Sequence, residues 1–442
     1  MKLRRIIPLL LLLGLLGGCS GMSIEELYCL PKASEDYYDL QEALSGILSQ
    51  GYSYHAPASG ARRESVQLVD LDHDGQDEAI AFFRSSQTGT VAAYIFARKD
   101  GNYEETAAID CPGSAVGSVE YADLDGSGRL ELIITCQVSE AVTQSLQVIR
   151  YEEEQAETVL TASCGRYELV DLNGDGAEEL FCVTGSGTDS AAAVNYYAWQ
   201  DGKLGENPEL RLSGDSSGIL KIQQGILDDG NGAVLVSSQS GDELVTDVYA
   251  WTEENGLRQV ELGDSGRSTY LRGRDLFPQD IDGDGCIEIP VDGSIPAHDT
   301  GTDSAAYVRW SGLTEKGGIT EKYLAYYCFD EGWYLELPEA WDGNISLAEN
   351  DETQGACTLH TVTFYHRRSG SRSDQKILSI CALWGADRQE QAEKRQLTSL
   401  YSDTDVILAA EIDDSAETWE GAVTVAQVSE RFHVLGAKND DN

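Results

Sequence analysis

Short apolar runs separated by turn residues cover most of the chain between residues 56 and 332. Representative runs lie at 132–134 and 180–183, and they have the length of buried strands rather than of helices. Several runs end in an aromatic residue and are followed by Asp-Gly or Asn-Gly, as at Asp201-Gly202, a pair that favours tight hairpin turns. The pattern therefore predicts a mainly β region built from hairpins.

Helical spacing of apolar residues occurs near the two ends of the chain. Tyr38, Leu40, Leu44 and Ile47 repeat at helical spacing between residues 35 and 50, which predicts one helix before the β region. After residue 332 the pattern predicts strands at 359–367, 376–384 and 404–412 and helices at 389–401 and 423–434. We expect a small C-terminal α+β module with its own core over residues 333–442, or alternatively extra blades that complete the preceding repeat.

An acidic phrase recurs through the β region. It places side-chain oxygens at alternate positions around glycine, closes on an acid at its ninth position and leads into an apolar run. The four copies begin at Asp70, Asp123, Asp171 and Asp280. Several oxygens in one tight glycine-containing loop suit a hard cation such as calcium.

The helical calcium loop is the rival interpretation, and it requires a glutamate at its twelfth position. The residues at that position in the four copies are Ala81, Ile134, Cys182 and Val291. We therefore expect a calcium loop that connects two β-strands.

The copies follow one another at intervals of about 50 residues, and a degenerate copy stands in step at residue 227. Because Leu227 and Leu235 replace both end ligands, we expect a hairpin without an ion there. Each period holds two hairpins, and a four-stranded sheet repeated in this way predicts a β-propeller of about five to seven blades. A β-solenoid is the alternative, although its repeats are usually shorter.

The phrases resemble those of the FG-GAP/VCBS repeat proteins, the integrin-type β-propellers. That resemblance implies side-chain ligands at positions one, three, five and nine, with the backbone carbonyl of position seven, and structural calcium. The implied sets are Asp70, Asp72, Asp74, Gln76 and Glu78; Asp171, Asn173, Asp175, Ala177 and Glu179; and Asp280, Asp282, Asp284, Cys286 and Glu288.

The copy at 123 departs from the family pattern, since Ser127 stands at position five and Arg129 at position seven. The resemblance implies a weaker site there. Its residues would be Asp123, Asp125, Ser127, Arg129 and Glu131.

The N-terminus has the features of an export signal. Lys2, Arg4 and Arg5 precede an apolar run at 6–16, which is short for a membrane span. The run ends Leu16-Gly17-Gly18-Cys19, which resembles a bacterial lipoprotein box and implies lipidation of Cys19. We expect a signal peptide at 1–18, a tether with a helix at 19–55, and a propeller at 56–332 held on the extracytoplasmic face of the bacterial membrane. An ordinary signal peptide or an anchor helix is the alternative.

The net charge and the cysteine spacing argue against some classes of function. The 442 residues include 31 basic and 76 acidic ones, for a net charge of −45, so binding to nucleic acid is not expected. The ten cysteines show no zinc or redox spacing, and no disulfide pairing is selected. We expect most of them to be free thiols.

Catalytic motifs are weak. Ser216 and Ser265 lie in Gly/Ser-rich acidic segments that lack the strand-to-helix setting or the histidine partner of a nucleophile. We expect Trp199, Trp251 and Trp310 to pack between sheets, with a sugar-binding platform as the alternative. The sequence thus favours a non-enzymatic binding or scaffold protein with an extracellular protein or glycan ligand. The alternative is a surface enzyme that acts on polysaccharide or cell-wall material at a propeller face.

Overall fold

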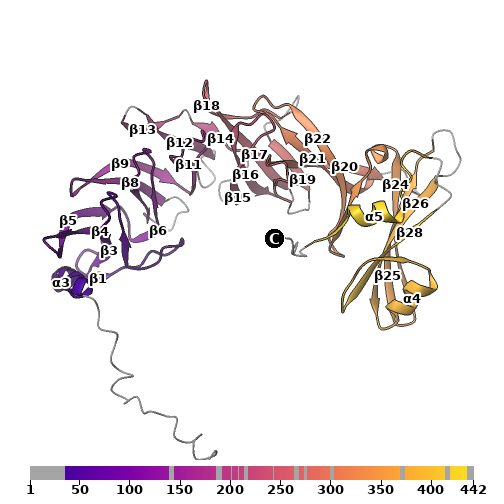
Figure 1. Cartoon of the computed structure of the whole chain (residues 1–442), viewed down its shortest axis with the longest axis horizontal. Coiled ribbons are helices and arrows are strands. Elements are labelled where there is room, and N and C mark those ends of the chain that lie inside the picture. Colours follow the sequence, from indigo (N-terminus) through magenta and orange to yellow (C-terminus); the bar gives the residue numbers. More distant parts are fainter. Residues whose placement is uncertain are drawn as a thin grey trace, which may run out of the picture. The chain divides into compact units, whose positions relative to one another are not determined.

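The computed structural model describes residues 35–138, 144–185, 192–200, 202–207, 209–213, 218–241, 243–262, 268–272, 276–298, 303–368, 374–413 and 419–435 (Figure 1). The predicted signal peptide, Cys19, the tether and both serine motifs lie wholly or largely outside these residues. Two compact units divide the chain, one mainly of residues 1–162 and one mainly of residues 163–442.

The first unit begins with the helix predicted near residue 35, α3 (Glu35–Ser49). Its buried Leu40, Leu44 and Ile47 pack with Phe83 and Phe96 of the first sheet. This sheet has the order β1-β3-β4-β5, and β2 also pairs with β3. Its strands are β1 (Tyr52–Tyr54), β2 (Val66–Val69), β3 (Glu78–Ser85), β4 (Val91–Lys99) and β5 (Asn102–Cys111).

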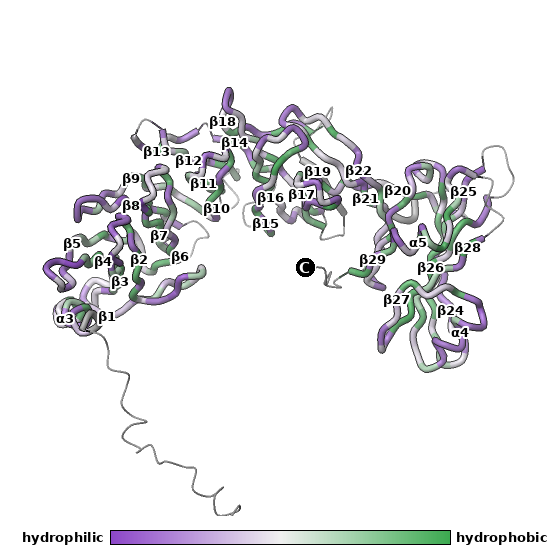
Figure 2. The backbone as a smooth tube through the Cα atoms, viewed as in Figure 1, coloured by the Kyte–Doolittle hydropathy of each residue, from purple (hydrophilic) through white to green (hydrophobic). Residues whose placement is uncertain are grey.

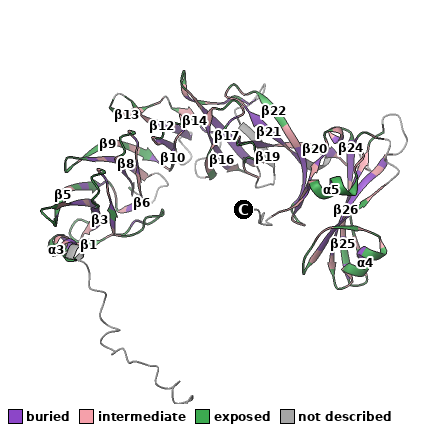
Figure 3. Cartoon of the chain, viewed as in Figure 1, coloured by how far each residue is buried: buried purple, intermediate pink, exposed green. Residues whose placement is uncertain are grey.

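A second sheet of the same unit has the order β6-β7-β8-β9. Its strands are β6 (Ala115–Ala122), β7 (Glu131–Gln137), β8 (Gln144–Glu152) and β9 (Gln155–Cys164). Residues of both sheets, such as Phe82 and Ile134, share one hydrophobic cluster. Strands β3 and β7 are buried along nearly their whole length, because each lies inside a sheet whose two faces are covered. Figure 3 colours buried residues purple.

The second unit contains two further sheets of this kind, with orders β10-β11-β12-β13 and β15-β16-β17-β18. The first consists of β10 (Arg166–Val170), β11 (Glu179–Thr184), β12 (Ala193–Gln200) and β13 (Lys203–Glu206), with β14 (Leu210–Arg211) paired to β12. The next consists of β15 (Ile219–Ile226), β16 (Gly232–Ser240), β17 (Glu243–Thr252) and β18 (Gly256–Gln259), with β19 (Ser268–Arg272) paired to β17. The protein is mainly β, as predicted. Each of these four sheets contains a path of four hydrogen-bonded strands, and three of the four sheets have a fifth strand paired beside that path.

Two five-stranded sheets complete the second unit, with orders β20-β21-β22-β23-β29 and β24-β25-β26-β28-β27. The first consists of β20 (Ile289–Pro296), β21 (Asp303–Leu313), β22 (Ile319–Cys328), β23 (Trp333–Leu337) and β29 (Phe432–Val434). The second consists of β24 (Ile345–Gln354), β25 (Cys357–His366), β26 (Gln375–Gly385), β27 (Thr398–Ser402) and β28 (Val406–Ile412). The short helices are η3 (Glu339–Trp341), α4 (Arg388–Lys394) and α5 (Val425–Arg431).

The predicted C-terminal helix at 389–401 is wrong in its second half. Helix α4 ends at Lys394, and Gln396 adopts a left-handed backbone with φ of 58°, which a continuing helix does not tolerate. The following residues form β27, which pairs with β28.

The predicted separate core of the C-terminal region is also wrong. One hydrophobic cluster joins Trp333 and Leu335 to Phe364, Ile380 and Leu408, so the last two sheets share their core. The predicted boundary at residue 333 falls inside a sheet, since β23 pairs with β22 on one side and β29 on the other.

Hydrophobic residues concentrate in the strands and hydrophilic residues in the connections between them (Figure 2). Within the described residues, no helix combines the length and the apolar character that a membrane span needs. The acidic phrases therefore stand where polar connections join largely buried strands.

Candidate metal centres

Each acidic phrase connects two antiparallel segments, as the sequence predicts. The residue before the first aspartate pairs with the glutamate at position nine. These pairs are Val69 with Glu78, Ala122 with Glu131, Val170 with Glu179, and Gln279 with Glu288. The register thus brings the first and last acids of each phrase to the same end of a hairpin.

The closing glutamate is buried and holds the loop together. Glu78, Glu179 and Glu288 are between 0% and 3% exposed. Each accepts a hydrogen bond from the backbone N–H of the second loop residue. The donors are Leu71 at 2.9 Å, Leu172 at 3.0 Å and Ile281 at 3.0 Å.

The first aspartate organises the turn in all four copies. Asp70 accepts backbone N–H groups of Asp74 at 3.1 Å and Gly75 at 3.0 Å. The glycine at position six has φ between 84° and 89° in each copy, a region that glycine adopts without steric cost. The first aspartate of every other copy also accepts the N–H of the position-six glycine. Its second donor is at position five in the copy at 123 and at position four in the copies at 171 and 280.

The carboxylates of three copies converge closely enough to share an ion. In each of three sets, one oxygen from every member lies within 4.8 Å of the others. These sets are Asp70, Asp72 and Glu78; Asp123, Asp125 and Glu131; and Asp171, Asp175 and Glu179. Clustered carboxylate oxygens are the donors that calcium prefers, so these residues fit the implied ion by chemistry.

In the part of the chain that the structure describes, two of the copies have no basic partner. Among the described residues, no lysine or arginine forms an ion pair with the ligand acids of the loop at 70 or of the loop at 171. Burial raises the pKa of Glu78 to about 7, and the neighbouring charges of Asp72, Asp74 and Asp70 add to the effect. Burial likewise raises the pKa of Glu179 to about 6. A bound cation would relieve this cost of holding buried negative charge.

The side chain of Asn173 is not oriented as its predicted role of metal ligand requires. Its amide nitrogen donates to Asp175 at 2.9 Å and to Glu179 at 2.8 Å, and its oxygen accepts the backbone N–H of Asp175. The oxygen therefore does not face the carboxylates, and the amide must turn over before it can act as a ligand.

The copy at 123 carries positive charge beside its acids. Arg150 Nε lies 3.6 Å from Glu131 Oε1. The Arg129 side chain contacts Ser127 Oγ at 3.3 Å and forms an ion pair with Glu152 at 2.5 Å. A weaker site at this copy stays a prediction, and these arginines are consistent with it.

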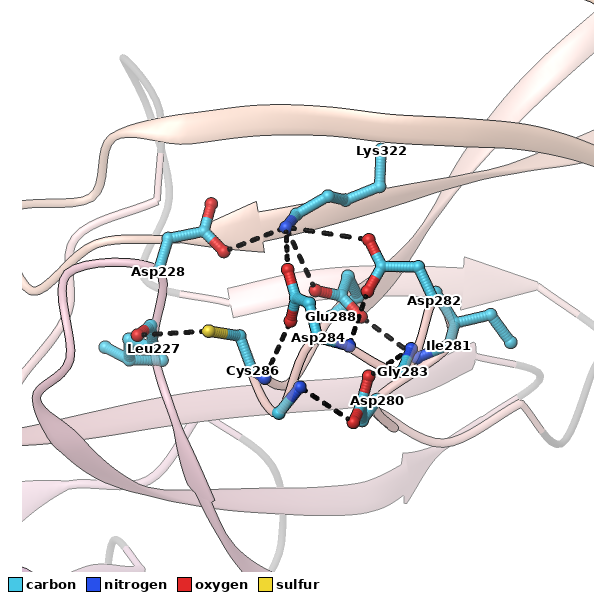
Figure 4. Close-up of polar contacts among 11 residues, drawn as sticks. Leu227, Asp228, Asp280, Ile281, Asp282, Gly283, Asp284, Cys286, Glu288 and Lys322 are labelled. Carbon is cyan, nitrogen blue, oxygen red and sulfur yellow. Dashed lines mark hydrogen bonds and ion pairs between the residues drawn. The ribbon is translucent and has the colours of Figure 1, made fainter.

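The copy at 280 has a lysine among its acids (Figure 4). The sequence predicts calcium binding for this copy, but its residues as arranged here do not fit a calcium ion. Lys322 Nζ lies 2.7 Å from Asp284, 3.7 Å from Asp282 and 3.7 Å from Glu288. It also lies 3.4 Å from Asp228, which belongs to the degenerate copy at 227. Sequence reasoning missed Lys322, which stands outside every copy of the phrase, and it gave Asp228 no role, because the copy at 227 was expected to hold no ion.

A further group of Cys328, Glu331 and His360 brings possible metal ligands together. Hydrogen bonds already use these side chains, since the Cys328 thiol donates to Glu331 and His360 pairs with Asp351 at 2.8 Å. The eight described cysteines are free thiols. Trp310 is fully buried, which excludes it as an exposed sugar platform.

Comparisons with known proteins give no family. The sequence matches no family model, and no curated protein matches it significantly. Among solved structures, a Bacillus licheniformis rhamnogalacturonan lyase is similar with a TM-score of 0.28 and 11% identity over 81% of this chain and 72% of that chain. The exotype rhamnogalacturonan lyase YesX has a TM-score of 0.27, 11% identity and the same coverages. Likenesses at these scores assign neither a fold nor an activity.

Proposed function

We propose that this protein is a lipid-anchored, extracytoplasmic β-propeller of the FG-GAP/VCBS type that uses calcium as a structural ion and acts as a binding or scaffold protein. In this proposal the successive four-stranded sheets are the blades. The ion closes the connection between the first two strands of a blade. The protein contributes no catalytic group, and the ion contributes only positive charge among fixed oxygens.

The observation that supports the calcium role is the loop at 70, with the matching loop at 171. In both, a buried glutamate and two aspartates converge, and no basic side chain of the described residues forms an ion pair with them. At millimolar calcium each such site should stabilise the fold by about 1 kcal/mol.

Calcium binding is tested by counting ions with native mass spectrometry and by recording Tm in EDTA and in calcium. We expect EDTA to lower Tm and added calcium to restore it. Asp72→Asn should remove one ion, whereas Glu157→Gln, which changes an exposed acid outside the loops, should not. An unchanged Tm together with no bound ion would contradict the proposal.

The binding role is tested with the mature chain on arrays of glycans and of purified surface proteins, in calcium and in EDTA. We expect retention of a ligand that weakens in EDTA, without chemical change of that ligand. Cleavage of a polysaccharide by the same preparation would instead support the enzyme alternative. Lipidation of Cys19 is tested by the intact mass of the membrane-extracted protein.

A further inference from the structure

Lys322 has an unusual environment for a lysine. It projects from β22 toward the loop at 280, and its side chain is only 17% exposed. Four carboxylates from two different loops surround its ammonium at distances of 2.7 to 3.7 Å (Figure 4). The contact at 2.7 Å to Asp284 is a charge-assisted hydrogen bond.

The buried oxygens of this cluster depend on the ammonium. Asp228 Oδ1 and Glu288 Oε1 are buried and accept no hydrogen bond. Both face Lys322 Nζ, at 3.4 Å and 3.7 Å. A buried charged oxygen without a partner is costly, so the ammonium supplies the compensation that these two atoms need.

A calcium ion and this ammonium compete for the same space. Calcium binds oxygens at about 2.3–2.6 Å and needs several of them around it. The ammonium already lies between Asp282, Asp284 and Glu288, which are three of the ligands predicted for this copy. Calcium could enter only after the lysine side chain has moved out, and the two positive charges would repel each other.

We propose that Lys322 is the resident cation of the loop at 280, so that this loop is closed without calcium. The inference rests on the proposed function, because it distinguishes one copy from the calcium-binding copies. Asp228 completes the lysine site and gives the degenerate copy at 227 a role in the next repeat.

The test counts calcium ions on the full chain by native mass spectrometry and measures their affinity by calorimetry. In the wild type, Asp282→Asn should leave the count unchanged, whereas Asp72→Asn should lower it by one. Lys322→Met should raise the count by one, and Asp282→Asn should remove that additional ion. Lys316→Met, at an exposed lysine that is 87% accessible, controls for loss of one positive charge and should leave the count unchanged.

The outcomes separate this inference from the proposed function. Loss of an ion when Asp282→Asn is made in the wild type overturns the inference, even if Asp72→Asn also loses one. No additional ion in a folded Lys322→Met protein overturns it as well. If Lys322→Met does not fold, the wild-type Asp282→Asn count decides alone. If Asp72→Asn loses nothing but Lys322→Met gains an ion, the inference stands and the proposed calcium role of the loop at 70 fails.

Discussion

The buried carboxylate of Glu78 accepts the backbone N–H of Leu71 at 2.9 Å, and so the last acid of the loop holds its second residue. Leu71 is itself fully buried. This bond fixes the glutamate in a position where its charge has little solvent, and burial raises its pKa to about 7. In the metal-free loop, the hydrogen bond from Leu71 to Glu78 therefore stabilises the fold, whereas the buried negative charge of Glu78 destabilises it.

Glu78→Gln should separate these two contributions. The glutamine oxygen can still accept from Leu71, but the negative charge is gone. At pH 8, above the pKa of Glu78, we expect the variant in EDTA to be more stable than the wild type by about 1 kcal/mol. The advantage should fade below pH 7, where the wild-type carboxyl is protonated. Calcium should stabilise the variant less, because a ligand has been lost.

Differential scanning calorimetry in EDTA and in calcium measures the stability of the metal-free protein and its stabilisation by calcium. Glu157→Gln, which removes an exposed charge, should change neither the stability in EDTA nor the stabilisation by calcium. A Glu78→Gln protein that is less stable than the wild type in EDTA at pH 8 would contradict this account of the buried charge.

Ser127→Asp should strengthen the copy at 123. The substitution places a carboxylate at the position that Asp74 and Asp284 occupy in other copies, and charge count tunes calcium affinity in such loops. We expect an approximately tenfold tighter site, or about 1.4 kcal/mol. Calorimetric titration in a background with Asp72→Asn and Asp175→Asn reports this site with the loops at 70 and 171 weakened. Ser86→Asp, at an exposed turn, should leave the affinity unchanged.

The hairpin loops were predictable because their information is local. Within nine residues the phrase contains the capping aspartate, the glycine with positive φ and the closing glutamate, and the apolar runs beside it specify the strands. The pairing of Val69 with Glu78 and its counterparts follows from that phrase alone. The helix at residue 35 was predictable for the same reason.

The sites of Lys322 and Asp228 were not predictable from the phrase. Lys322 stands on β22 and Asp228 in an earlier hairpin, and only the packing of one sheet beside another brings them to Asp284. The shared C-terminal core was missed for a similar reason. Strand β23 pairs locally with β22, but its pairing with β29 joins residues about 100 positions apart, such as Trp333 and Val434, and no local pattern records such a contact.

His55 should make the fold sensitive to mild acid. Its Nε2 accepts the backbone N–H of Val116 at 3.3 Å, which requires the neutral ring. Burial lowers the pKa of His55 below its ordinary value of 6.5, and the charge of Arg84 lowers it further. This contribution to stability is therefore present above pH 6.5 and is lost as the pH falls through the folded-state pKa.

His55→Gln retains an acceptor at the same place without a titrating group. We expect the Tm of the wild type to fall relative to that of the variant between pH 7 and pH 5. Both proteins are measured in EDTA, so that calcium binding does not contribute. Parallel Tm curves over this range would show that His55 is not responsible.

Trp310 should be a packing residue whose loss is costly. It is fully buried, and its Nε1 donates to the Tyr327 hydroxyl at 3.0 Å. Trp310→Phe removes that donor and part of the buried ring, so we expect a loss of about 2 kcal/mol. Trp251→Phe, at a half-buried tryptophan, should cost less than about 1 kcal/mol. Urea denaturation compares the free energies of unfolding of the two variants, and equal losses would contradict the view that the burial of Trp310 makes its substitution more costly.

Glycan retention on the array should be unaffected by Trp310→Phe, since a ring with no exposed face cannot stack on a sugar.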